Sequence, residues 1–223
     1  MVWARGETGI GEDGGIHYGP AMSRFYSLAF DPLLRPLRRQ VLLVFCELGI
    51  GNVLDIASGT GAQCRVLGEG GIQATGVDLS EAMVELASRR GGRNVRYIQG
   101  TAYELPFEDR AFDAALLSLA LHEHTEDERA LMLNEALRVI GRDGQLVVAD
   151  YSVPPVRRLH LLWHGIGFVE HVAGSAHREG FQDFVRRGGV EGLLVRRGLP
   201  VRAMRRALWR TVDVAVVPVV PFT

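Results

Sequence analysis

Apolar residues along most of this chain occur in two kinds of segment. Short apolar runs, typical of buried strands, lie at about 52–57, 72–79, 94–99, 112–119 and 145–151. Apolar residues with helical spacing lie between several of these runs, at about 61–69, 80–90 and 125–140. Strands that alternate with helices imply right-handed crossovers, so the pattern predicts an α/β fold with a doubly wound, mainly parallel sheet.

The two ends of the chain have other patterns. Residues 1–20 are rich in glycine and predict a loose arm, after which helix-spaced apolar positions continue to residue 48. Beyond the fifth run, a helix is predicted at about 178–187, and the segments 201–210 and 212–220 are predicted as a β hairpin. We expect a single domain over residues 1–223.

The first strand leads into its helix through a glycine turn. Gly59 and Gly61 lack the Cβ atoms that would keep a ligand away from the backbone. A strand, turn and helix of this kind opens a mononucleotide-binding half, with the ligand outside the carboxyl end of the strand. Asp78 ends the second strand, where a carboxylate can accept hydrogen bonds from both hydroxyls of a ribose. The turn therefore predicts a nucleoside site.

Two kinds of nucleoside ligand fit this turn differently. A dinucleotide site needs a third glycine for close packing of the helix, and Cys64 occupies that place. A cofactor with an amino-acid tail instead needs an acid beside the turn to meet an ammonium group, and Asp55 can supply it.

Composition narrows the function further. The net charge is −1, so no overall field attracts nucleic acid. The chain has no Lys, which removes Schiff-base chemistry and the Walker lysine. Cys46 and Cys64 lack the spacing of a disulfide framework or a zinc site, so we expect no metal and a cytoplasmic location. Residues 151–223 hold 11 Arg against 5 acids, which either favours an acidic partner or reflects solvated arginines.

Five stretches then follow one another in the predicted sheet: Val53–Gly61, Gly76–Ser80, Gly100–Phe107, Phe112–Ala115 and Leu137–Leu146. Together they resemble the motifs of the class I S-adenosylmethionine-dependent methyltransferases, over about residues 50–152. The Leu-Pro-Phe segment is similar to the branch that includes ubiquinone/menaquinone C-methyltransferases. The resemblance implies S-adenosylmethionine as cofactor and a Rossmann-like, mainly parallel sheet with an antiparallel C-terminal strand.

The resemblance also implies a set of cofactor-binding residues. They are Tyr18, Tyr26, Asp55, Ala57, Gly59, Gly61, Asp78, Leu79, Met83, Thr101, Ala102 and Ser118. In this set, Asp55 would meet the methionine part, Asp78 the ribose and Ser118 the region of the sulfonium. Position 101 is Thr where the family commonly has Asp. The hydrogen bond from the adenine amino group would then be accepted by a main-chain carbonyl or by a hydroxyl. Alternatively, Asp55 orders the turn, Ser118 is a strand-end hydrogen bonder and Tyr26 packs in the core.

Methyl transfer from a sulfonium needs alignment and a dry site more than it needs a base. If the acceptor is a hydroxyl or a ring carbon, a group must take a proton, and His122 after the fourth strand is the candidate catalytic base. Its neighbours Thr125 and Glu128 are predicted to form a capping box. Aromatic and histidine side chains from His160 to His177 predict either an acceptor pocket or a packed helical lid. As a pocket, the segment 152–190 would offer apolar walls from Trp163, Phe168, Phe181 and Phe184 and polar contacts from His160, His164 and His171, and His122 would reach the same cavity.

The sequence therefore predicts transfer of a methyl group from S-adenosylmethionine to a small-molecule acceptor. The single domain is expected to comprise an N-terminal helical cover (1–48), a cofactor-binding core (50–152) and a substrate lid (152–190). A catalytically inactive methyltransferase-like binding module and, as a weaker alternative, a nicotinamide-dependent oxidoreductase are the rival interpretations. We expect no nucleic-acid partner and no stable membrane insertion, while the acceptor and a homodimeric state stay open.

Overall fold

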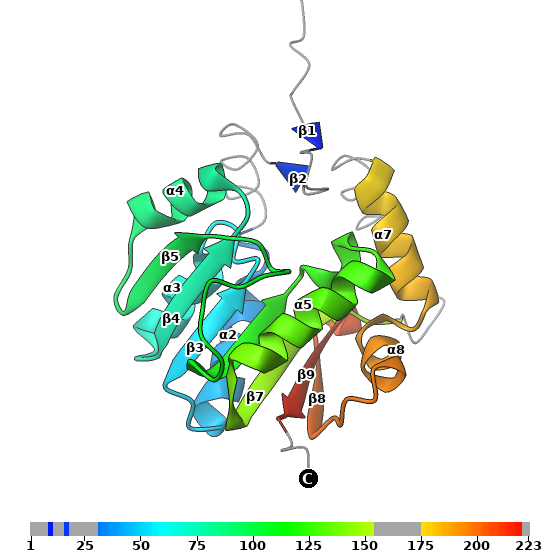
Figure 1. Cartoon of the computed structure of the whole chain (residues 1–223). Helices are drawn as coiled ribbons and strands as arrows, with labels where there is room; N and C mark the ends of the chain where they lie inside the picture. The colour runs from blue at the N-terminus through cyan, green and yellow to red at the C-terminus, as the bar shows by residue number, and fades with distance from the viewer. Residues whose placement is uncertain (1–8, 11–15, 18–30, 154–174, 220–223) are drawn as a thin grey trace, which may run out of the picture.

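A seven-stranded sheet forms the centre of the computed structural model, which describes residues 9–10, 16–17, 31–153 and 175–219 (Figure 1). The strand order is β5-β4-β3-β6-β7-β9-β8. The strands are β3 (Asn52–Ile56), β4 (Gln73–Asp78), β5 (Val95–Gln99), β6 (Phe112–Ser118), β7 (Ile140–Tyr151), β8 (Ala203–Ala207) and β9 (Val212–Pro218). Strands β3 to β7 are parallel, and β9 runs antiparallel to both β7 and β8. The predicted fold class is confirmed.

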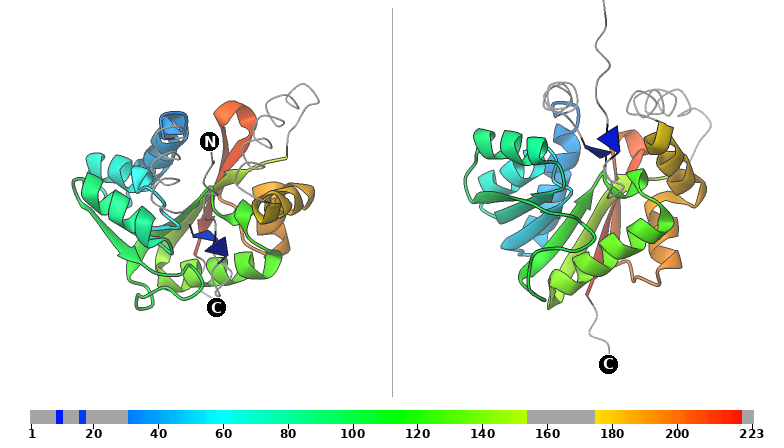
Figure 2. Two further views of the ribbon diagram at one scale, coloured as in Figure 1. Left: turned by 90° about the horizontal axis from the view of Figure 1, so that it is seen from above. Right: turned by 45° about the horizontal axis from the view of Figure 1, so that its top comes forward.

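Helices cover both faces of this sheet (Figure 2). They are α2 (Arg35–Glu47), α3 (Ala62–Glu69), α4 (Glu81–Arg90), α5 (Glu126–Val139), α7 (Ser175–Arg186) and α8 (Gly189–Arg196), with short 3-10 turns η1 (Leu121–Glu123) and η3 (Leu208–Arg210). On one face, Phe45 of α2 and Leu67 of α3 pack in one apolar cluster. On the other face, Met132 of α5, Phe184 of α7 and Leu193 of α8 pack in a second cluster. Because side chains alternate along a strand, each inner strand contributes to both clusters.

Local sequence signals fix where several helices begin. The Ser80 side chain accepts a hydrogen bond from the Met83 N–H and caps α4. Thr125 and Glu128 form the predicted capping box at the start of α5. Gly61 caps α3 in the left-handed conformation, with φ of +68°, which favours glycine.

Two elements differ from the sequence prediction. Strand β7 begins at Ile140 rather than near residue 145, because Ile140 pairs with Phe112 across an irregularity in the ladder. Helix α8 was not predicted, since the glycines at 188 and 189 indicated only the end of α7. Gly188, with φ of +97°, both follows α7 and caps α8. The apolar residues of α8 complete the second cluster.

The segments outside the sheet are described in part. Of the predicted cover, the structure describes α2 and an antiparallel pair, β1 (Gly9–Ile10) and β2 (Ile16–His17). Of the predicted lid, it describes α7 and the start of α8. In Figure 1 the parallel strands run towards the top of the picture, where α4 and α7 lie on either side of the sheet. The carboxyl ends of β3, β4 and β6 meet there.

Candidate active site

A cavity of about 900 Å³ lies at the carboxyl ends of β3, β4 and β6. It is lined by most of the predicted cofactor residues: Asp55, Ala57, Gly59, Asp78, Leu79, Met83, Thr101, Ala102 and Ser118. Tyr18 and Tyr26 lie outside the described residues. The sequence motifs thus converge on one cavity, although they are up to 63 residues apart, from Asp55 to Ser118.

Asp78 links the glycine turn to the next strand. Its Oδ2 accepts a hydrogen bond from the Gly59 N–H at 2.7 Å, and its Oδ1 accepts one from the Ser80 N–H at 2.9 Å. Burial raises the pKa of the Asp78 carboxyl, and these two N–H groups act against that rise. Each carboxylate oxygen can accept more than one hydrogen bond, so Asp78 can hold the turn and still meet a ligand.

The two glycines of the turn have different tasks. A Cβ at Gly61 would lie 2.5 Å from Cε1 of Tyr97, whose hydroxyl donates to the Gly61 carbonyl at 3.1 Å. A Cβ at Gly59 would meet no atom within 4 Å. Gly59 therefore leaves open space at the cavity wall. Gly61 is not among the cavity-lining residues, and its missing Cβ lets the Tyr97 ring pack against the turn.

One end of the cavity carries polar groups that suit a cation. Asp55 is buried, and its carboxylate accepts a hydrogen bond from the Cys64 thiol at 3.2 Å. Burial raises the pKa of Asp55 to about 7, while the Cys64 hydrogen bond and the Arg38 charge lower it. Gln63 also lines the cavity, and its buried Oε1 has no hydrogen-bond partner among the described residues. A bound ammonium group would satisfy Gln63 and favour the ionised form of Asp55.

A cluster around Asp31 forms an adjoining wall that the sequence did not indicate. Asp31 accepts from Arg38 Nη2 at 2.8 Å, from Arg90 Nη1 at 3.1 Å and from the Thr60 hydroxyl at 3.2 Å. These four residues come from the segment before α2, from α2, from the glycine turn and from the end of α4. No local sequence motif predicts this cluster, because its members are distant in the sequence and meet only through side-chain contacts.

The structure corrects the prediction that His122 reaches this cavity. His122 is 3% exposed and is not among the cavity-lining residues. Its Nδ1–H donates to Asp150 Oδ1 at 2.8 Å, and its ring packs edge-on against Tyr151 and Phe181. The hydrogen bond to Asp150, a buried residue of β7, holds the imidazole ring of His122 away from the cavity. His124, two residues later, lines the cavity instead.

The side of the cavity formed by α7 is more polar than predicted for an acceptor pocket. The lining residues on α7 and directly after it are Glu179, Gly180, Gln182, Asp183, Arg186 and Arg187. Phe181 and Phe184, predicted as pocket walls, are instead buried, and the Arg129 guanidinium lies 4.9 Å from the centre of the Phe184 ring. This correction has a simple cause, since the apolar face of α7 packs on the protein. The remaining members of the predicted aromatic and histidine cluster (His160, Trp163, His164, Phe168 and His171) lie outside the described residues.

Comparison with known proteins agrees with this geometry. Residues 54–148 match the family model described as "Methyltransferase domain". A curated relative named demethylmenaquinone methyltransferase from Clavibacter sepedonicus is 37% identical over 107 residues, which cover 47% of this chain and 43% of the relative. One of the same name from Thermus thermophilus is 35% identical over 133 residues, 57% of this chain and 59% of the relative. The chain thus spans about half the length of these relatives.

The fold has solved counterparts. A SAM-dependent methyltransferase from Aquifex aeolicus superposes with a TM-score of 0.62 at 17% identity, covering 91% of this chain and all of that one. Among the helices that the structure describes, none is both long and apolar enough to cross a membrane. Within the same described ranges, no group of three or more His, Cys, Asp or Glu side chains could hold a metal ion.

Proposed function

We propose that the chain is a class I S-adenosylmethionine-dependent methyltransferase, which transfers a methyl group from S-adenosylmethionine to a small-molecule acceptor; the match of residues 54–148 to the methyltransferase domain model supports this. The observation that supports this most is the pairing of Asp55 and the unsatisfied Gln63 Oε1 at one end of the cavity with Asp78 beside the open Gly59 position. An amino-acid tail and a ribose need these two kinds of group.

In this proposal the turn region holds the cofactor in three places. Asp55 and Gln63 bind the ammonium group of the methionine part, and Asp78 binds the ribose hydroxyls. Leu79, Met83 and Ala102 contact the adenine, as apolar side chains of the same cavity wall. S-adenosylmethionine, when bound, supplies a methyl group already activated by positive sulfur.

The chain's own residues orient the reactants and keep water away. Ser118, at the end of β6, lines the cavity, and we assign it to the region of the sulfonium. The Thr101 hydroxyl accepts a hydrogen bond from the Tyr103 N–H at 3.2 Å, which orders the segment assigned to the adenine edge. Alignment of two reactants in such a site lowers the barrier without covalent chemistry by the protein.

We propose a hydroxylated aromatic ring as the acceptor. Curated relatives of this chain are named demethylmenaquinone methyltransferase, which supports an acceptor of the reduced-quinone class. The cavity wall also carries Tyr103 and His124, groups that can accept and orient a proton lost by such a ring.

A transfer assay with S-adenosylmethionine labelled in the methyl group tests the proposal. With 1,4-naphthohydroquinone as the acceptor, we expect labelled product and S-adenosylhomocysteine in equal amounts. Binding of S-adenosylhomocysteine without any transfer, to this probe or to simple phenols and catechols, would favour an inactive binding module instead. Hydride transfer to NAD⁺ would favour the oxidoreductase alternative.

A further inference from the structure

His124 is the histidine that the described cavity exposes. Its side chain is 25% exposed, whereas that of His122 is 4% exposed. His124 follows η1 and lines the cavity together with Tyr103 and Glu128. Its Nδ1 lies 2.9 Å from the Tyr103 hydroxyl oxygen, and the two rings meet edge to face.

The direction of the Tyr103–His124 hydrogen bond follows from Glu128. The Glu128 carboxylate accepts from the Thr125 N–H at 2.7 Å and from the Thr125 hydroxyl at 2.8 Å, and its Oε2 lies 3.9 Å from Nδ1 of His124. A negative carboxylate beside Nδ1 favours the His124 tautomer that carries its proton on Nδ1. The Tyr103 oxygen then accepts from the Nδ1–H of His124, which leaves the Nε2 lone pair free of that proton.

The surroundings of His124 and Glu128 favour a neutral imidazole and an ionised carboxylate. Burial of Glu128 raises its pKa, but the Thr125 hydrogen bonds, the neighbouring His124 ring and the Tyr103 hydroxyl outweigh burial and lower the pKa. Burial lowers the pKa of His124 to about 4; the charges of His122 and Arg129 act in the same direction, and Glu128 and Asp150 act against it. Glu123 stands beside His122, with 3.8 Å between Oε1 and Nε2. His124 is therefore neutral at pH 7 and able to accept a proton.

We propose that His124, oriented by Tyr103 and Glu128, accepts the proton that the methyl acceptor loses. This inference rests on the proposed function. It narrows the acceptor to molecules whose reacting atom carries a proton, such as a ring hydroxyl or a ring carbon beside one. Tertiary amines and thioethers, which lose no proton on methylation, do not use this relay.

The proton and charge balance in this step. The acceptor atom forms a bond to the methyl carbon as the carbon–sulfur bond breaks, and the acceptor's proton passes to Nε2 of His124. The positive charge thereby moves from sulfur to the imidazole ring. The Nδ1–H of that imidazolium lies beside the Tyr103 hydroxyl oxygen and 3.9 Å from the anionic Glu128 carboxylate, which stabilises the charge.

The tautomer of His124 provides a test that needs neither cofactor nor acceptor. Nitrogen-15 NMR of histidine-labelled protein, assigned with His124→Gln, should show Nδ1 protonated and Nε2 unprotonated at pH 7. Tyr103→Phe should abolish this preference. Tyr151→Phe is the matched control, because it removes a phenol hydroxyl outside the cavity wall, and it should leave the tautomer unchanged. An Nε2–H tautomer in the wild-type protein would overturn the relay.

Kinetics provide the second arm, with 1,4-naphthohydroquinone as the probe. His124→Gln should lower kcat by about 10²- to 10⁴-fold. Its affinity for S-adenosylhomocysteine should equal that of the wild type, which also shows that the variant is folded. Retention of turnover in His124→Gln, with loss in His122→Gln, would overturn the proposal. Failure of the wild type to bind S-adenosylhomocysteine would contradict the proposed function alone, since the tautomer is read without ligand.

Discussion

The end of the cavity that we assign to the cofactor and the end that we assign to the acceptor are built in different ways. At the cofactor end, Gly59, Asp78 and Ser80 meet through backbone N–H groups at the ends of two neighbouring strands. At the acceptor end, η1, α5 and α7 are joined by side chains, above all by the buried Arg129. A backbone-built site is encoded in short contiguous stretches, whereas a side-chain-built site depends on contacts between distant parts of the chain.

Removal of the Arg129 charge should have the largest effect and should act on the acceptor end. Arg129 is fully buried and donates to the Leu121 carbonyl at 2.9 Å, to the Gly180 carbonyl at 3.0 Å and to Asp183 at 3.0 Å. Arg129→Met should lower the free energy of unfolding by about 3–5 kcal/mol, because a buried ion-pair network loses its cation. Urea denaturation measures this change.

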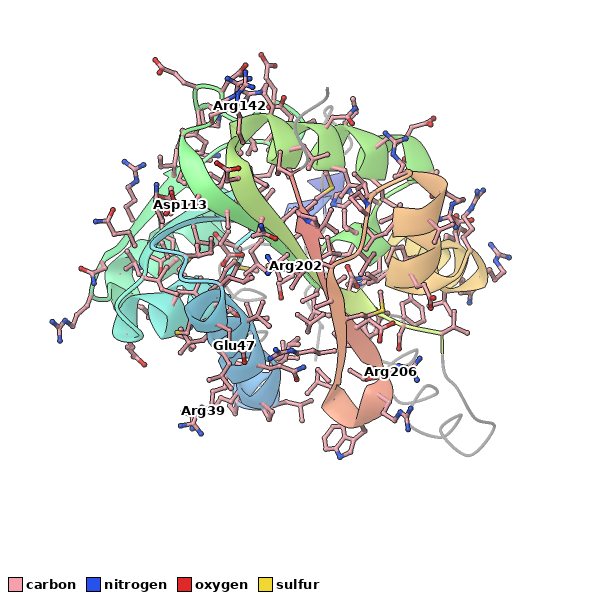
Figure 3. All side chains as sticks on the ribbon, turned by 90° about the horizontal axis from the view of Figure 1, so that it is seen from below. Arg39, Glu47, Asp113, Arg142, Arg202 and Arg206 are labelled. Carbon is pink, nitrogen blue, oxygen red and sulfur yellow. The ribbon has the colours of Figure 1, made fainter. Side chains whose placement is uncertain are left out.

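The matched control for Arg129 is Arg142, which is exposed near the start of β7 (Figure 3). Arg142→Met should change the free energy of unfolding by less than about 0.5 kcal/mol. Hydrogen exchange should increase in α7 of Arg129→Met and remain unchanged in α3. Equal stability of the two variants would show that Arg129 does not hold the acceptor end together.

Asp78→Ala should break the cofactor end. Its carboxylate is expected to donate no proton and to accept two ribose hydrogen bonds, each contributing roughly 1.5–3 kcal/mol before water compensates in part. Calorimetric titration should therefore show a loss of affinity for S-adenosylhomocysteine of at least about tenfold. Unchanged affinity in a folded variant would contradict the ribose assignment.

Asp113 offers a matched carboxylate for that experiment. It also accepts two backbone N–H groups, from Asn52 at 2.9 Å and from Gly51 at 3.3 Å, but at the amino end of the sheet (Figure 3). Asp113→Ala should lose some stability and keep wild-type affinity. A similar loss of affinity in both variants would mean that the effect of Asp78 is a general consequence of a weakened sheet.

The same contrast explains how much the sequence could predict. The glycine turn, the strand-end position of Asp78 and the capping box at Thr125 are local patterns, and the structure places all of them as expected. The place of His122 after the fourth strand predicts a base at the cavity, but the position of its ring depends on Asp150, 28 residues away. A position at the end of a strand does not show whether the side chain faces the cavity or packs in the protein interior.

Helix α7 shows the same limit. Residue type alone predicts Phe181 and Phe184 as pocket walls, yet they lie on the buried face of the helix. Charged neighbours such as Asp183 and Arg187 line the cavity instead. Amphipathic periodicity predicts that a helix has two faces, but only the packing partners decide which face meets a ligand.

The two glycines of the turn should respond differently to alanine. Gly61→Ala places a Cβ against the Tyr97 ring and keeps φ at +68°, so it should lower stability by about 1–3 kcal/mol. Gly59→Ala has φ of +52° but meets no atom, so its stability loss should be smaller and its main effect should be weaker binding of S-adenosylhomocysteine. Thermal unfolding and calorimetry separate the two. Equal losses of stability and of affinity in the two variants would contradict the assignment of Gly61 to packing and Gly59 to ligand binding.

The smallest expected effect is a proton released from Asp55. Its pKa of about 7 means that much of it is protonated at pH 6, whereas an ammonium group favours the ionised carboxylate. Binding of S-adenosylhomocysteine should therefore release a proton at pH 6, and affinity should rise about eightfold between pH 6 and 7.5. Calorimetry in buffers of different ionisation enthalpy detects the proton. Asp55→Asn should abolish both effects, and a wild-type affinity independent of pH would contradict the assignment.

Calorimetric titration of the wild-type chain with S-adenosylhomocysteine and, separately, with NAD⁺ tests the central claim most directly. The claim is that the cavity at β3 and β4 binds a nucleoside with an amino-acid tail and does not bind a dinucleotide. We expect one molecule of S-adenosylhomocysteine to bind per chain and NAD⁺ to give no binding heat. Binding of NAD⁺ without binding of S-adenosylhomocysteine would contradict the account.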